Sequence, residues 1–196
     1  MKRILFVLLL AGLLIGCNSQ AEQIAEYKEE LQNVADEMLV NAAAAEDILS
    51  QYDIVWNHTI KSGGAIPVEE MANVTGLEES VVRGYFQVNN IDNIPDDFSN
   101  NIHSLNAYYD ASGDLGEIEE AAEQISNKIN ELNDPPDGYE NVYDEVLDMY
   151  LYTDEYVEIA FNPDGSLQSF NEKVNQLSSE ITSKYKRIEA IMPNED

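Results

Sequence analysis

The chain has 196 residues, of which 38 are Asp or Glu and 10 are Lys or Arg, so its formal net charge is −28. A surface this acidic repels nucleic acid phosphates and anionic lipid headgroups, because both are bound through clustered Lys and Arg side chains. The remaining partners are cations, basic proteins and charge-screened surfaces. Alternatively, the acidity only keeps the protein soluble and apart from its neighbours.

The first 17 residues have the parts of an export signal. Lys2 and Arg3 precede an apolar run from Ile4 to Gly16, and Cys17 follows it. A membrane-spanning helix needs roughly 20 apolar residues, so this run is too short to be a finished anchor.

Residues Leu14, Ile15, Gly16 and Cys17 resemble the lipobox of bacterial lipoproteins. The resemblance implies that residues 1–16 are a signal peptide, that cleavage follows Gly16, and that the Cys17 thiol carries a diacylglycerol. It also implies a lipid-anchored protein on the extracytoplasmic face of the cell membrane. The alternative is an ordinary cleaved signal with a chance cysteine, but Cys17 is the only cysteine and stands where a lipobox requires it.

Residues 17–196 are expected to form a single domain. From residue 21 to about residue 62, apolar residues recur every three or four positions, which predicts one helix of about 40 residues and roughly 60 Å. Gly63 and Gly64 end it. The predicted seam consists of Ile24, Tyr27, Leu31, Val34, Met38, Ala42, Ala45, Leu49, Tyr52 and Val55 or Trp56.

Residues 63–95 lie outside this long repeat. Two short helical stretches, 68–74 and 78–87, are separated by Thr75 and Gly76. They resemble a helix-turn-helix in spacing, but Arg83 stands alone against four glutamates, so a DNA-binding role is not expected. A small helical insertion packed on the main helices is the prediction.

A further helix is predicted from about residue 96 to residue 133, broken or kinked at 112–116. Oxygen-bearing residues near this break raise the question of a cation site. An EF-hand needs Gly at loop position 6 and Glu at position 12, where this chain has Leu115 and Ala121. An irregular cation site formed by Asp110, Asp114 and Glu117 remains open, beside the simpler interpretation of a solvated helix break.

Two more helices are predicted, from 139 to about 161 and from Ser166 onward. Turn signals precede both: residues 134–138 contain two prolines and a glycine, and residues 162–165 read Asn-Pro-Asp-Gly. Helices joined by so short a turn pack antiparallel. The sequence therefore predicts an all-α fold, an elongated antiparallel up-down-up-down four-helix bundle with a small helical insertion after the first helix, and no strands.

Tyrosines concentrate between residues 139 and 156. Tyr139, Tyr143 and Tyr150 fit the apolar seam, whereas Tyr152 and Tyr156 are expected at its edge or facing outward. The cluster indicates either core lining with hydroxyls at the rim or a partner-binding face.

Catalytic motifs are not found in the sequence. His58 and His103 lack the His-Glu-x-x-His and Glu-x-x-His spacings of metal sites, and a Gly-x-Ser-x-Gly motif is missing. We therefore predict a protein that is not an enzyme and has no cofactor or metal.

The turn motifs at residues 135–139 and 162–170 resemble those of uncharacterised lipobox-containing helical-bundle lipoproteins of Gram-positive bacteria. The resemblance covers about 60 residues, fits residues 63–95 least, and implies fold and location only. The sequence leads to a non-enzymatic envelope lipoprotein that binds another envelope protein or acts as a spacer. The alternative is a cation- or small-ligand-binding lipoprotein serving a transporter, with its pocket where residues 112–116 interrupt the second helix.

Overall fold

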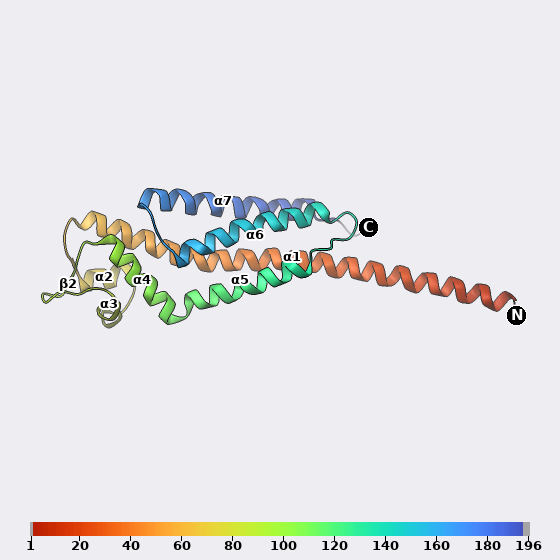
Figure 1. Cartoon of the computed structure of the whole chain (residues 1–196), viewed down its shortest axis with the longest axis horizontal. Helices are drawn as coiled ribbons and strands as arrows, with labels where there is room; N and C mark the ends of the chain where they lie inside the picture. Colours follow the sequence, from red (N-terminus) through yellow and green to blue (C-terminus); the bar gives the residue numbers. More distant parts are fainter. Residues whose placement is uncertain (1, 194–196) are drawn as a thin grey trace.

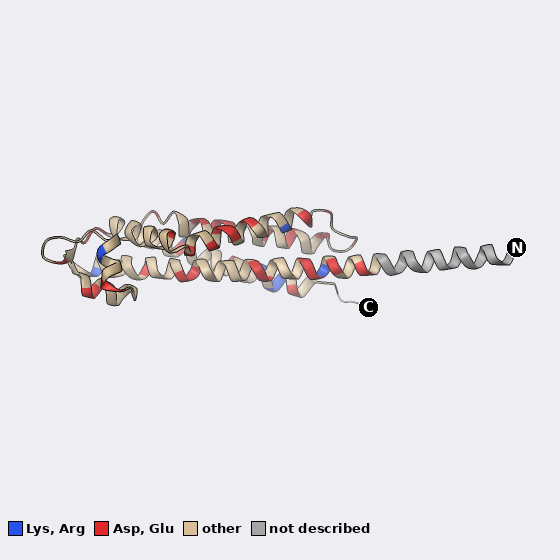
Figure 2. Ribbon diagram, turned by 90° about the horizontal axis from the view of Figure 1, so that it is seen from below, with Lys and Arg blue, Asp and Glu red and all other residues tan. Residues whose placement is uncertain are grey.

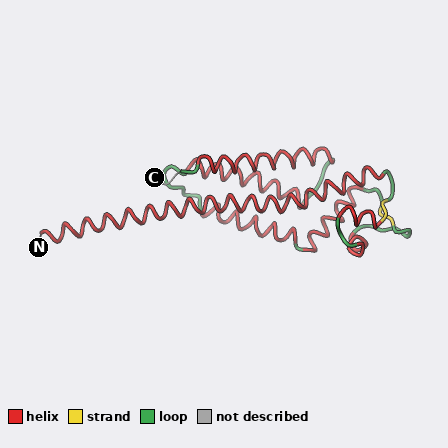
Figure 3. The backbone as a smooth tube through the Cα atoms, turned by 180° about the vertical axis from the view of Figure 1, so that it is seen from behind, coloured by secondary structure: helices red, strands yellow, loops and turns green. Residues whose placement is uncertain are grey.

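A computed structural model describes the backbone of residues 2–193 and the side chains of residues 20–193. Over this part the chain is all-α, apart from two strands of two residues each (Figures 1 and 3). The predicted fold class is confirmed at this level. In chain order the elements are α1 (Lys2–Ser62), β1 (Ile66–Pro67), α2 (Val68–Thr75), α3 (Glu79–Tyr85), β2 (Asn93–Ile94), α4 (Phe98–Ser112), α5 (Asp114–Glu131), α6 (Glu140–Phe161) and α7 (Leu167–Ile191).

Helix α1 is the element on which the others pack. It contacts α2, α4, α5, α6 and α7, and α6 and α7 also pack on each other (Figure 1). The predicted seam is confirmed from Leu31 onward, while Ile24 and Tyr27 are partly buried against the core. Burial of this stripe is the main stabilising contribution, because each fully buried large apolar side chain is worth about 1.5–3 kcal/mol.

Residues 63–95 form a cap on the end of the bundle opposite the N-terminus (Figures 1 and 3). It contains the two predicted short helices, α2 and α3. The prediction of no strands is wrong here, because β1 and β2 pair antiparallel with Ile66 opposite Ile94. Both isoleucines are buried and belong to the common hydrophobic core, so this pairing holds the cap against it. Strands of two residues are too short to leave an alternating pattern in the sequence.

The predicted break in the second long helix is confirmed. Helix α4 ends at Gly113, whose φ of 95° is a left-handed conformation that side chains disfavour. Asp97 caps the start of α4 by accepting a hydrogen bond from the Asn100 amide at 3.1 Å. Helix α5 starts directly after Gly113.

Tyrosine hydroxyls tie the helices together at their carboxyl ends. Tyr27 donates to the Leu132 carbonyl (2.8 Å), and Tyr143 donates to the Ile129 carbonyl (3.2 Å), both at the end of α5. At the end of α6, Tyr52 donates to the Ala160 carbonyl at 3.0 Å. The last carbonyls of a helix have no partner within it, so these bonds satisfy groups that burial would otherwise penalise.

Ion pairs and a cap fix the C-terminal helices. Ser166 caps α7 in a reciprocal capping box with Ser169. Lys184 on α7 pairs with Glu145 on α6 at 2.9 Å, and the guanidinium of Arg187 reaches the same carboxylate at 2.5 Å. The hydrogen bonds to its acidic neighbours raise the pKa of Lys184.

The side chains of Gly16 and Cys17, the predicted cleavage and lipidation residues, lie outside the described residues. In the part of the chain whose side chains are described, no helix is both long enough and apolar enough to cross a membrane.

Candidate functional site

A groove with a volume of about 870 Å³ lies between α1 and α5 and begins at the break between α4 and α5. We call it the α1–α5 groove. This volume lies within the range of about 300–1,000 Å³ that is usual for small-ligand sites. Its apolar surface comes from Val40, Ala44, Ile48, Ile118, Ala121 and Ile125. The alanines leave the two helices without large side chains to fill the space between them.

One wall of the groove holds polar groups that have no hydrogen-bond partner. Asn41 is only 3% exposed, and its Nδ2 makes no hydrogen bond. Ten residues further along α1, the buried Oε1 of Gln51 is also unpaired. The spacing places the two groups about 15 Å apart along the helix. An unpaired buried polar group costs about 1–3 kcal/mol, so both positions favour a ligand that supplies the missing partners.

The groove is strongly acidic. Its lining includes the carboxylates of Asp36, Glu37, Asp47, Asp114 and Glu117. Among the described ion pairs, only that between Lys128 and Glu37 brings a positive charge to this set. Low-dielectric walls lined by charge of one sign concentrate the field and attract counter-charged ligands. Figure 2 shows the same imbalance over the part of the chain whose side chains are described, where acidic positions greatly outnumber basic ones.

Tyr109 lies at the mouth of the groove and is partly buried there. Burial, followed by the neighbouring Tyr108 and the carboxylates of Asp114 and Asp47, raises the pKa of Tyr109 to about 12. The phenol therefore stays neutral at physiological pH. It offers a hydroxyl and a ring face to a ligand in the groove.

The cation site proposed for Asp110, Asp114 and Glu117 is not formed. Within the described residues, no three His, Cys, Asp or Glu side chains come close enough to hold a metal ion. All three side chains are exposed, and Asp114 accepts a hydrogen bond from the Ser112 hydroxyl at 2.6 Å. Asp114 and Glu117 turn into the α1–α5 groove, whereas Asp110 does not line it. The hypothesis assumed an irregular loop at the helix break, but the chain ends α4 at Ser112 and begins α5 at Asp114, with only Gly113 between them.

The expectation that Tyr156 faces outward is wrong. Tyr156 is 1% exposed and belongs to the core, while Tyr152 is half-buried at its edge. Bulky side chains at 152 and 156 share one face of α6 because they are four residues apart, but α1 covers the end that carries Tyr156. The pair therefore forms no outward partner-binding face.

A second groove, of about 470 Å³, lies on the other side of α5, against α6. It is also acidic, with Glu119, Glu123, Asp154 and Glu158 in its lining. None of the unpaired buried side-chain atoms identified in the described part of the chain belongs to it. It thus offers charge without the unsatisfied groups of the α1–α5 groove.

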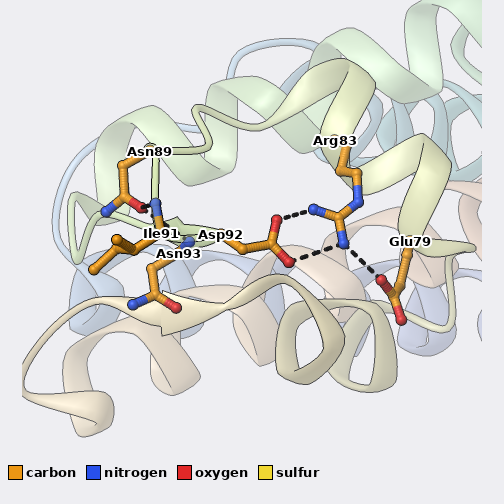
Figure 4. A network of polar contacts seen from close by, with 6 residues as sticks. All are labelled: Glu79, Arg83, Asn89, Ile91, Asp92 and Asn93. Atoms are coloured by element: carbon orange, nitrogen blue, oxygen red, sulfur yellow. Dashed lines mark hydrogen bonds and ion pairs between the residues drawn. The ribbon is translucent and has the colours of Figure 1, made fainter.

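The cap carries a rigid turn that presents one apolar side chain (Figure 4). Asn89 Oδ1 accepts hydrogen bonds from the amides of Ile91 (3.0 Å) and Asn93 (3.1 Å). Arg83 holds the Asp92 carboxylate with its two terminal guanidinium nitrogens and also reaches Glu79 at 2.8 Å. The Ile91 side chain is left 75% exposed.

Asn41 and Gln51 are site residues that periodicity did not identify. Asn41 lies three residues after Met38 and four before Ala45, so a polar residue on the buried face of the helix was the available signal. No protein-family model, curated protein or solved structure matches this chain.

Proposed function

We propose that this protein is a lipid-anchored, non-enzymatic binding module that acts on the extracytoplasmic face of a cell membrane. The lipobox resemblance of residues 14–17 supports an anchor on Cys17. Two acyl chains give stable membrane attachment, since one chain alone binds only marginally. In this proposal the four long helical segments, with α4 and α5 counted as one, form an elongated up-down-up-down bundle that carries the groove away from the membrane.

The observation that carries the binding function is the α1–α5 groove. It combines a buried Asn41 amide without a partner with carboxylates that outnumber the basic groups paired to them. A spacer needs no such unsatisfied groups. The groove therefore favours binding of a positively charged ligand over a purely structural role.

A ligand-binding lipoprotein serving a transporter is the second candidate. It required a pocket at residues 112–116, and the α1–α5 groove begins there, with Asp114 in its lining. In both candidates the same groove takes the ligand. In the first candidate the ligand is part of a partner protein, and in the second it is a free molecule that is delivered to a transporter.

The anchor and the groove are tested on the full chain produced in a bacterium. Mass spectrometry of the mature N-terminus is expected to find a diacylglyceryl group on Cys17 and none after Cys17→Ala, which should also leave the protein in the soluble fraction. Detection of an unmodified N-terminus on a protein with Cys17 intact would refute the anchor. Isothermal titration with spermine, a soluble polycation, tests the groove.

A matched pair of variants assigns any binding to the groove. Asp47→Asn with Glu117→Gln removes two groove carboxylates. Glu46→Gln with Glu119→Gln removes two carboxylates from the same helices outside it. We expect the groove pair alone to weaken spermine binding by about 30-fold, since two contacts are lost and each is worth on the order of 1 kcal/mol. Equal loss in both pairs would show that only net charge matters.

A further inference from the structure

We propose that the ligand of the α1–α5 groove is an extended basic peptide segment, with lysine or arginine side chains on the carboxylates and a backbone carbonyl on Asn41. This inference rests on the proposed binding function and names its ligand class. The ligand class follows from the buried hydrogen-bonding groups of the groove that have no partner.

The first step is whether each unpaired group is a hydrogen-bond donor or an acceptor. Asn41 Nδ2 is a donor and needs an acceptor, whereas Gln51 Oε1 is an acceptor and needs a donor. A protonated polyamine has donors only, so it can satisfy Gln51 and the carboxylates but leaves Asn41 unpaired. A peptide backbone carries both kinds of group at every residue.

The second step is length. Asn41 and Gln51 are ten residues apart on α1, or about 15 Å. An extended peptide advances about 3.3 Å per residue, so roughly five residues span the two groups. Metal ions and single amino acids are too short to reach both ends of the groove.

The third step is polarity. The floor made by Ala44, Ile48, Ile118 and Ala121 suits apolar or small side chains, and Val40 adds an apolar side chain that is 71% exposed at the edge. The carboxylates of Asp47 and Glu117 suit Lys or Arg. An alternation of basic and small residues matches this arrangement, because neighbouring side chains of an extended peptide point to opposite sides.

Titration calorimetry of the full chain in detergent tests the peptide with three probes. The first is the capped hexapeptide acetyl-(Ala-Lys)3-amide, the second is spermine, and the third is acetyl-(Ala-Glu)3-amide as the acidic control. We expect the basic peptide to bind, and the acidic peptide to show no heat of binding. Asn41→Leu should weaken the binding of the basic peptide by about tenfold and leave the binding of spermine unchanged. Only the peptide has a carbonyl that loses the Asn41 Nδ2 donor.

A matched control separates this effect from a loss of folding. Asn101 is as buried as Asn41, but its Nδ2 donates to the Pro95 carbonyl (3.0 Å) and to Thr59 Oγ1 (3.3 Å) outside the groove. Asn101→Leu is expected to destabilise the protein and to leave peptide affinity unchanged. Asn41→Leu should instead raise the melting temperature, which shows that the lost binding is not unfolding.

The outcomes separate the two proposals. One outcome is that Asp47→Asn/Glu117→Gln weakens the binding of both spermine and the basic peptide, while Asn41→Leu changes neither affinity. The groove then binds cations, and the peptide assignment is overturned. If neither probe distinguishes the groove pair from Glu46→Gln/Glu119→Gln, the groove function itself fails. The same peptide with free termini identifies the source. Weaker binding than the capped form, from repulsion of its carboxylate, indicates an internal segment of a protein, and tighter binding indicates a free oligopeptide.

Discussion

Two buried tyrosines, Tyr52 on α1 and Tyr156 on α6, should respond in opposite ways to the loss of the hydroxyl oxygen. Tyr52 and Tyr156 are both almost fully buried. The Tyr52 hydroxyl donates to the Ala160 carbonyl at 3.0 Å and accepts from Asn106 Nδ2 at 2.9 Å. The Tyr156 hydroxyl has no partner. The substitutions Tyr52→Phe and Tyr156→Phe therefore compare a satisfied hydroxyl with an unsatisfied one at similar burial.

The magnitudes follow from the partners. Tyr52→Phe removes two hydrogen bonds, but Asn106 still donates to the Ala160 carbonyl at 3.1 Å, so nothing is left wholly unpaired. We expect a loss of about 1–2 kcal/mol in the free energy of unfolding. Tyr156→Phe removes a desolvated hydroxyl without breaking a bond and should gain about 1 kcal/mol. For a domain of this size, 1 kcal/mol corresponds to a shift of about 2–4 °C in melting temperature.

The stability difference between wild type and Tyr156→Phe should also depend on pH. Burial, with a smaller contribution from Glu46, raises the pKa of Tyr156 to about 12. The folded-state pKa lies above the unfolded value near 10, so the unfolded state loses its proton first as the pH rises. The titration of Tyr156 leaves the free energy of unfolding unchanged below about pH 10 and lowers it progressively between about pH 10 and pH 12. The advantage of Tyr156→Phe should therefore grow by about 1.4 kcal/mol per pH unit across that interval.

Urea unfolding followed by circular dichroism at neutral and alkaline pH measures both effects. The other tyrosines are common to wild type and variant, so their titration cancels in the difference. A Tyr156→Phe protein that is less stable than wild type at neutral pH would refute the reasoning, because it would mean that the hydroxyl is satisfied. A difference that stays constant above pH 10 would show that the phenol is not desolvated.

Three further substitutions test other parts of the fold. Trp56 is 3% exposed and packs between aromatic rings, so Trp56→Ala should lower the free energy of unfolding by about 3–5 kcal/mol in urea titrations; a loss below about 1 kcal/mol would contradict that packing. Arg83→Gln removes the exposed pair with Asp92 and should cost less than about 1 kcal/mol, yet hydrogen exchange at residues 91–93 should quicken; unchanged exchange would mean that the turn holds without it. Lys184→Met should lower the free energy of unfolding by about 1 kcal/mol at neutral pH. The difference should shrink above the ordinary lysine pKa of 10.5, because the raised folded-state pKa means that the stabilisation by the ion pair fades with rising pH. A difference independent of pH would assign the loss to packing instead.

The helices were predictable because their cause is local. A three- and four-residue apolar repeat places the stripe of α1 on one face whatever lies opposite, and Gly113 needs only its own backbone to end α4. The strand pairing of Ile66 with Ile94 was not predictable, since it joins residues 28 positions apart across the cap. The same applies to Tyr156, whose burial depends on a neighbouring helix and not on the repeat within α6.

The tyrosine content had a structural explanation that composition could not reveal. Tyr27, Tyr52 and Tyr143 each bring a hydroxyl to a carbonyl near the end of another helix. A tyrosine can line an apolar seam and still reach such a carbonyl with its terminal hydroxyl, which phenylalanine cannot do. The sequence shows the seam, but the carbonyls come from helices that only the tertiary fold brings near.

The buried asparagines differ in whether their side-chain amides donate hydrogen bonds. Asn101 is buried and Asn106 is partly buried, and the Nδ2 of each donates to acceptors on other elements, so each joins α4 to its neighbours. Asn41 is about as buried as Asn101, but its Nδ2 donates to no acceptor. A leucine there would continue the apolar face and remove an unpaired donor, so stability alone does not account for the residue. Local departures of this kind concentrate at functional sites. Asn41 lies in an acidic groove where, among the described ion pairs, only Glu37 is paired with a cation. A ligand that supplies both an acceptor and a cation resolves the two anomalies together.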